Sequence, residues 1–151
     1  MAIGFEIWEG EGTFTYPDHP FDGVVDELDG LLERLDAGRM AHAAHVSAHI
    51  SALEKLVAPQ PDFIDGHAHL GFALLDLGKP RKALEACLRG MAIGDGVIPP
   101  GFTGAIPWGY LDNRPFLRAL HGAALCQLRL RRRRDAVQLM ERILVINSND
   151  N

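Results

Sequence analysis

Histidines are the side chains of this sequence best suited to chemistry, and most of them lie close together. Three of them, His42, His45 and His49, are separated by three and four residues, which places them on one face of a predicted helix. Two more begin the next predicted helix. Imidazoles grouped in this way can bind zinc or another transition metal, so a metal-binding protein or a hydrolase is one interpretation. The cluster consists of His42, His45, His49, His67 and His69.

Other features count against a metal site and against catalysis. The sequence has no HExxH pattern, Asp65 is the one nearby carboxylate that is well placed, and His67 occupies a packing position. Cys87 and Cys126 lie inside apolar helical patterns, without a basic neighbour arranged to activate them. No serine sits on a nucleophile elbow, and the segment GDGVIPPG is not followed by the helix that a phosphate site needs. We therefore predict a protein that is not an enzyme, with no cofactor and no metal, and keep the histidine cluster as the alternative.

Two stretches of the chain resemble each other at the spacing of a helical hairpin. They cover residues 62–93 and 115–146. Each has a small residue within a first apolar helix, a short basic turn, and an alanine in a second apolar helix. Gly71 and Ala83 hold these positions in the first copy, and Ala124 and Ala136 hold them in the second. Because one such hairpin cannot bury its apolar face alone, the repeat predicts stacked hairpins with an exposed concave surface.

The rest of the chain divides around these two units within one predicted domain, 1–151. An N-terminal arm, 1–21, has short alternating stretches typical of an extended or hairpin-like segment. An irregular hairpin follows at 22–58, with helices expected from Asp22 to about Leu35 and from about Met40 to Val57. The regular hairpins occupy 62–93 and 114–146, with Asp62 and Asn113 as the expected N-caps.

A long loop, residues 94–113, separates the two regular hairpins. Its length favours either a functional or a disordered segment, and its aromatic residues argue against disorder. We expect it to fold back over the helices. Trp108 then either fills the gap between the hairpins, or lines a narrowed groove together with Tyr110.

The segment HLGFALLDLGKPRKALEACLRGMAI resembles the tetratricopeptide repeat. Leu70, Gly71, Leu74, Gly78 and Ala83 match the repeat pattern, whereas other residues replace its tryptophan, its second-helix aromatic and its later alanine. The second copy matches more loosely, since an arginine replaces the turn glycine. The stretch WGYLDNRPFLRALHG and the closing NSNDN also resemble a bacterial group of repeat proteins loosely related to the suppressor-of-tumorigenicity proteins. The resemblance implies an all-α, right-handed α-solenoid of about three hairpins. The departures are His67, Cys87, Gly90 and Arg131.

The same resemblance identifies a groove that binds a protein or peptide segment. Acidic residues on one helix would face basic residues on the next, which suits a partner with both charges, although the two walls could instead pair with each other. Arg114 and Arg118 are suited to bidentate binding of a carboxylate. The expected groove residues are Asp65, His69, Phe72, Asp76, Trp108, Tyr110, Arg114, Arg118, His121, Leu125 and Arg129.

Charge is distributed unevenly along the chain. Residues 1–36 contain ten acids and one base, whereas residues 111–151 contain four acids and eight bases. The run Arg131–Arg134 lacks interleaved aromatic residues and falls at a predicted turn, so we expect no nucleic-acid partner. We also expect no membrane partner and a cytoplasmic location, because no apolar span or signal peptide is evident. The last helix has an apolar side without a following repeat to cover it, which favours a homodimer, or a structural homo-oligomer as a further alternative. The residues of this side are Val137, Met140, Ile143, Leu144 and Ile146.

Overall fold

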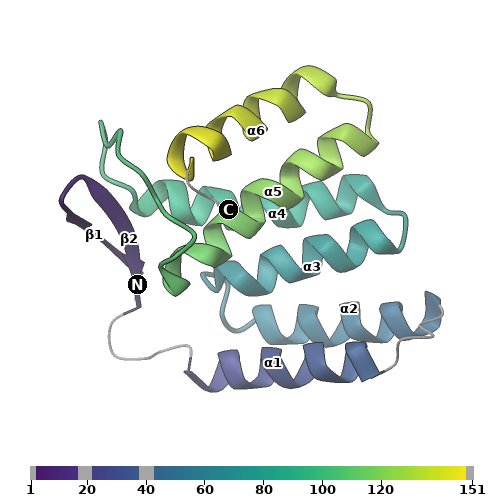
Figure 1. Ribbon diagram of the computed structural model, residues 1–151. Helices are drawn as coiled ribbons and strands as arrows, with labels where there is room; N and C mark the ends of the chain where they lie inside the picture. Colours follow the sequence, from purple (N-terminus) through teal and green to yellow (C-terminus); the bar gives the residue numbers. More distant parts are fainter. Residues whose placement is uncertain (1–2, 17–21, 38–42, 149–151) are drawn as a thin grey trace.

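The computed structural model describes residues 3–16, 22–37 and 43–148, and in these ranges the protein is mostly helical (Figure 1). A two-stranded hairpin precedes a stack of helices. The helices, with one short 3₁₀ turn named η1, are α1 (Asp22–Ala37), α2 (Ala43–Val57), α3 (Ile64–Asp76), α4 (Pro80–Val97), η1 (Leu111–Asn113), α5 (Arg114–Arg129) and α6 (Arg133–Ile146).

The expectation of an all-α chain is wrong at the N-terminal arm. Strands β1 (Gly4–Trp8) and β2 (Glu11–Thr15) pair antiparallel, with Phe5 opposite Phe14. Glu9 and Gly10 join them in a two-residue turn with positive φ angles of 49° and 85°, as a tight hairpin of this kind requires. Of the two alternatives for the arm, extended or hairpin-like, the structure has the hairpin, in the form of a regular β-sheet pair.

The helices pack in chain order, as the internal repeat predicts. α3 packs against α4, α5 packs against both, and α6 packs against α5. The first pair is arranged differently, because α2 lies between α1 and α3 in the stack (Figure 1). The described helices thus place α1 and α6 at opposite ends of the molecule.

Small residues occupy the points where helices cross closely. A Cβ atom at Gly71 would collide with the Cys87 side chain, and Ala83 beside it is fully buried. A Cβ at Gly94 would likewise collide with the ring of Phe116 on α5. Close packing of α3 and α5 on α4 therefore depends on these positions staying small.

The turns within the two regular hairpins have the same geometry but different residues. After α3, Gly78 has φ +78°, and the backbone N–H groups of Gly78 and Lys79 donate to Leu75 and Leu74. After α5, Arg131 adopts φ +61° with the equivalent pair of hydrogen bonds. Both are Schellman motifs, which favour glycine at the left-handed position. Arg131 therefore adopts a conformation that glycine would adopt with less strain.

Two helix boundaries differ from their predictions, and at a third the predicted N-cap residue is correct but its side chain makes no capping hydrogen bond. Phe63, not Asp62, is the N-cap residue of α3. Asn113 is the N-cap residue of α5, but its side chain makes no capping hydrogen bond. α4 continues to Val97, past the predicted start of the loop, and ends where Ile98 takes the extended conformation favoured before a proline.

A column of aromatic rings attaches the hairpin and the loop to the helices. Phe102 contacts Phe5, Phe5 contacts Phe14, and Phe14 contacts Phe116, with ring centroids 5.1 Å apart at each step. Phe14 and Phe116 are completely buried. The arm is thus part of the core.

None of the described helices combines the length and apolar character needed to cross a bilayer.

Candidate functional site

Asn113 connects the N-terminal arm with the loop that precedes α5. Its Oδ1 accepts a hydrogen bond from the N–H of Phe14 at 2.9 Å, and its Nδ2 donates to the carbonyls of Gly12 and Pro107 at 3.0 and 3.1 Å. The side chain is fully buried. It satisfies the polar backbone of the arm and of the loop where water is excluded. The sequence analysis missed this role and identified the residue only as a helix cap.

Asn147 performs a similar task at the end of α6. Its Oδ1 accepts a hydrogen bond from the N–H of Trp108 at 2.9 Å, and the N–H of Ile106 donates to the carbonyl of Ile146 at 2.6 Å. Asn147 is buried. The loop is therefore fixed at both the arm and the last helix, which positions the indole of Trp108.

Trp108 lies beneath two arginines. The guanidinium carbon of Arg114 is 4.9 Å from the ring centroid, and that of Arg118 is 5.6 Å from it. Arg114 also donates from Nε to the carbonyl of Trp108 at 3.0 Å. Cation–π contact and this hydrogen bond hold the Arg114 guanidinium in place. Within the described part of the chain, its two terminal nitrogens have no hydrogen-bonding partner.

Arg118 is already paired with an acid across the two helices. Its Nη1 is 2.7 Å from Oδ1 of Asp65, and Nε2 of His69 is 3.4 Å from the same oxygen. Burial on its own would raise the pKa of Asp65, but His69, by hydrogen bond and charge, and Arg118 outweigh burial and lower that pKa below its ordinary value. Asp65 therefore stays ionised, and the two walls of the predicted groove do pair at this point.

A pocket of about 500 Å³ adjoins this pair, and we call it the arm pocket. The arm, α1, α3 and the start of α5 all contribute to it, and its lining combines apolar side chains with acids and two arginines. Burial, followed by the charges of Asp112 and Asp65, raises the pKa of Tyr16 in its wall. The lining residues are Tyr16, Val25, Asp29, Phe63, Asp65, Leu111, Asp112, Arg114, Pro115 and Arg118.

The remaining predicted groove residues are not all drawn together. Phe72 and His121 face each other from α3 and α5, with ring centroids 6.0 Å apart. Asp76 and Arg129 are exposed, and the described residues contain no ion pair between them. Tyr110 lies elsewhere, because its hydroxyl donates to Glu11 of the hairpin at 2.9 Å. The α3–α5 face thus runs from the arm pocket past Phe72 and His121, without Tyr110.

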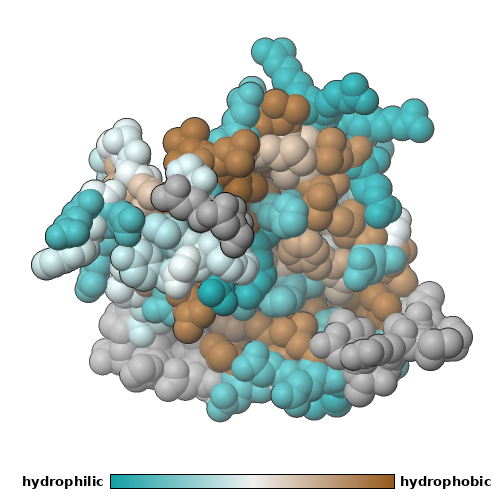
Figure 2. Space-filling view, in the orientation of Figure 1, coloured by the Kyte–Doolittle hydropathy of each residue, from teal (hydrophilic) through white to brown (hydrophobic). Residues whose placement is uncertain are grey.

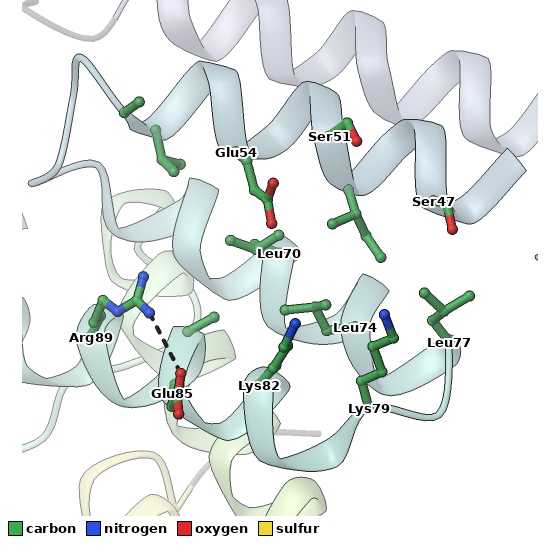
Figure 3. A pocket seen from close by; sticks show the side chains of 14 residues that line it. Ser47, Ser51, Glu54, Leu70, Leu74, Leu77, Lys79, Lys82, Glu85 and Arg89 are labelled. Atoms are coloured by element: carbon green, nitrogen blue, oxygen red, sulfur yellow. Dashed lines mark ion pairs between the residues drawn. The ribbon is translucent and has the colours of Figure 1, made fainter. Parts of the chain in front are cut away.

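A second pocket, of about 590 Å³, lies between α2 and α4 (Figure 3). Leu70 and Leu74 of α3, and Leu77 directly after it, point toward this pocket, and charged side chains surround it. Glu85 and Arg89 form an exposed ion pair there, with 3.9 Å between Oε2 and Nη2. None of the predicted groove residues lies in this pocket.

The histidines do not converge within the described residues. His67 is buried, and its Nε2 is 2.7 Å from the carbonyl of Pro61, so that nitrogen is used as a hydrogen-bond donor. His49 is buried on α2, whereas His69 contacts Asp65. In residues 3–16, 22–37 and 43–148, no group of three or more His, Cys, Asp or Glu could hold a metal ion. His42 lies outside the described residues.

The two cysteines are buried thiols that interact with each other. The hydrogen bond to Cys126, and then burial, raise the pKa of Cys87 far above its ordinary value. A thiol in this state is a poor nucleophile. It fills space at the crossing of α3, α4 and α5, beside Gly71 and Gly122.

Comparison with known proteins supports the helical fold. No protein-family model and no curated protein sequence matches the chain. The crystal structure of MamA, a protein that contains tetratricopeptide repeats, superposes with a TM-score of 0.50 at 23% sequence identity. The match covers 66% of this chain and 44% of that one, so this chain spans less than half of MamA. The similarity shows a tetratricopeptide-like helical fold.

Proposed function

We propose that this protein is an interaction module which binds a peptide or protein segment along the α3–α5 face, with a carboxylate of the partner held in the arm pocket. The proposal depends on Arg114, whose guanidinium is held in place but not used up by other residues. Its guanidinium is held by Trp108, while its terminal nitrogens lack a partner among the described residues and border a cavity. A guanidinium fixed in this way binds a carboxylate with little loss of side-chain entropy.

The lining of the arm pocket supports a partner of mixed chemistry. Leu111, Pro115 and Val25 offer apolar contact near the arginine, while Asp29 and Asp112 are exposed acids. A segment with one acidic, one basic and one apolar group would match the arginine, the exposed acids and the apolar side chains of this pocket. The tetratricopeptide-like fold supports the same use of the concave face, because repeat folds commonly bind extended or helical segments there. A right-handed solenoid of three hairpins is part of this proposal.

Arg114 is a better probe of the site than Arg118. Replacing Arg118 would leave the partly buried carboxylate of Asp65 without its nearest cationic partner, which destabilises the fold as well as any binding. Replacing Arg114 removes a cation whose terminal nitrogens are unused within the described residues. Arg114→Ala also removes the hydrogen bond to the Trp108 carbonyl and the cation–π contact with its indole, so the thermal stability of the variant is compared with that of wild type before binding is measured.

The experiment is a selection of binding peptides from a random phage-displayed library on immobilised protein. We expect peptides selected on the wild type to share a carboxylate, and we expect Arg114→Ala to lose them. Arg89→Ala is the matched control, since Arg89 lines the α2–α4 pocket instead. Selected peptides that bind Arg114→Ala as well as wild type but fail on Arg89→Ala would reject the arm pocket and favour the other one.

A further inference from the structure

The outer side of the α5–α6 hairpin is an apolar face that its counterpart does not expose. Leu75 and Leu84 are buried in the α3–α4 hairpin, where α5 packs on both helices. The same shift along the sequence that relates Gly71 to Ala124 relates Leu75 to Leu128 and Leu84 to Val137. In the α5–α6 hairpin these two residues, Leu128 and Val137, are 43% and 44% exposed. Leu144, two turns after Val137 on the same side of α6, is 67% exposed. We call Leu128, Val137, Met140 and Leu144 the end face.

Arginines surround one end of the end face. Arg129 and the run Arg131–Arg134 are exposed at the α5–α6 turn, and none of them forms an ion pair within the described residues. Arg133 follows the helical spacing of Val137, Met140 and Leu144, so it extends the same stripe. Figure 2 shows apolar side chains over α6 and hydrophilic side chains projecting beside this turn.

The tip of the β-hairpin has the complementary composition. Trp8 is 75% exposed and Ile7 is 51% exposed, although both are large apolar residues at the end of a strand. Glu6 and Glu9 flank them and are also exposed, and no base lies in the hairpin. The tip projects from the helices at some distance from α6 (Figure 1). It is therefore an acidic knob with an aromatic centre, on a different surface from the end face.

We propose that the hairpin tip of one copy of this chain docks on the end face of a second copy. Trp8 would cover Val137 and Leu144, while Glu6, on the same face of β1 as Trp8, and Glu9 at the turn meet the arginines of the α5–α6 turn. Exposed tryptophan and arginine are the residues most enriched at the energetic centres of protein interfaces. Because the two surfaces differ, the contact is head-to-tail, and a pair of copies keeps a free end face on one copy and a free tip on the other. The arm pocket is not needed for this contact.

Sedimentation velocity over a range of protein concentrations tests the proposal. We expect wild type to associate as concentration rises, and the association to weaken between about 0.05 and about 0.5 M salt, because the charged part is screened. Trp8→Ser and Leu144→Asp should each weaken self-association about tenfold or more. Both positions are exposed, so both variants should keep the thermal stability of wild type. Val145→Ser serves as the matched control, because Val145 is an exposed apolar residue of α6 that belongs neither to the end face nor to the arm pocket.

Mixing the two variants identifies the geometry. Trp8→Ser keeps an intact end face and Leu144→Asp keeps an intact tip, so an equimolar mixture should form a heterodimer although neither variant associates alone. A wild type that stays monomeric at all concentrations would overturn the proposal. A mixture that fails to associate would also overturn it, because a head-to-tail contact leaves one intact tip and one intact end face in that mixture. A control Val145→Ser that weakens association as much as Trp8→Ser would do the same.

Discussion

The two regular hairpins have equivalent backbones and different surroundings. In the α3–α4 hairpin a glycine forms the left-handed turn, a histidine occupies a packing position, and the apolar side of both helices is covered by α5. In the α5–α6 hairpin an arginine forms the turn, a leucine takes the place of the histidine, and the corresponding side is exposed. The same side of the hairpin is therefore core in the first unit and free surface in the second.

The largest contrast should come from truncating equivalent core and end-face residues. Leu84→Ala removes a buried side chain and should lower the free energy of unfolding by about 2–5 kcal/mol. Val137→Ala at the equivalent position of the second hairpin should change it by no more than about 0.5 kcal/mol. Urea denaturation at a concentration where the protein is monomeric measures both. Equal losses would mean that the two hairpins are buried alike, contrary to the comparison.

Acidification should destabilise the protein through the buried His67, whose equivalent in the second hairpin is a leucine. Burial lowers the pKa of His67, although its hydrogen bond to Pro61 partly opposes this, and burial also lowers the pKa of His49. The unfolded chain therefore takes up protons first as pH falls. Stability is complete above the ordinary imidazole pKa of about 6.5 and is lost as pH falls below it toward the lower pKa of the folded state.

Replacing His67 with leucine, the residue of the second hairpin, tests this assignment. We expect His67→Leu to reduce the loss of stability between about pH 7.5 and about pH 5.5, with the remainder due to His49. Thermal unfolding measured across this range gives the result. An unchanged pH dependence in His67→Leu would show that the buried ring is not the source.

The turns provide the smallest effect. Arg131→Gly removes strain at a positive φ angle and should stabilise the protein by about 0.5–1 kcal/mol, whereas Gly78→Ala should destabilise it by a similar amount. Chemical denaturation of the two single variants measures the pair. Opposite signs are the expected outcome, and a destabilised Arg131→Gly would indicate that the arginine side chain makes a contact that matters for folding.

Local pattern was sufficient to predict the helical hairpins, but not what crosses between them. Gly71 and Ala83 predicted a close crossing, because both are small and they lie on consecutive helices of one repeat. Gly94 was assigned to a loop, yet it continues α4 because Phe116 of α5 packs against it, and that contact is tertiary. A helix-breaking residue is tolerated where a larger one would collide.

The candidate site was predictable in part for the same reason. Asp65 and Arg118 occupy equivalent positions of the two copies, so the repeat alone brought them to facing helices. Tyr16, Leu111 and Asn113 belong to segments without periodicity, and their association depends on a buried asparagine that satisfies distant backbone groups. No local signal distinguishes such an asparagine from a helix cap.

The most direct test of the central claim is a double-mutant cycle between Arg114 and the carboxylate of a selected peptide. Isothermal titration would measure Kd for wild type and Arg114→Ala, each with the peptide and with its amide counterpart. We predict that the two changes are coupled by about 1 kcal/mol or more, because each removes the same contact. Additive losses, or equal affinities for the peptide and its amide counterpart, would contradict binding of a carboxylate by Arg114 in the arm pocket.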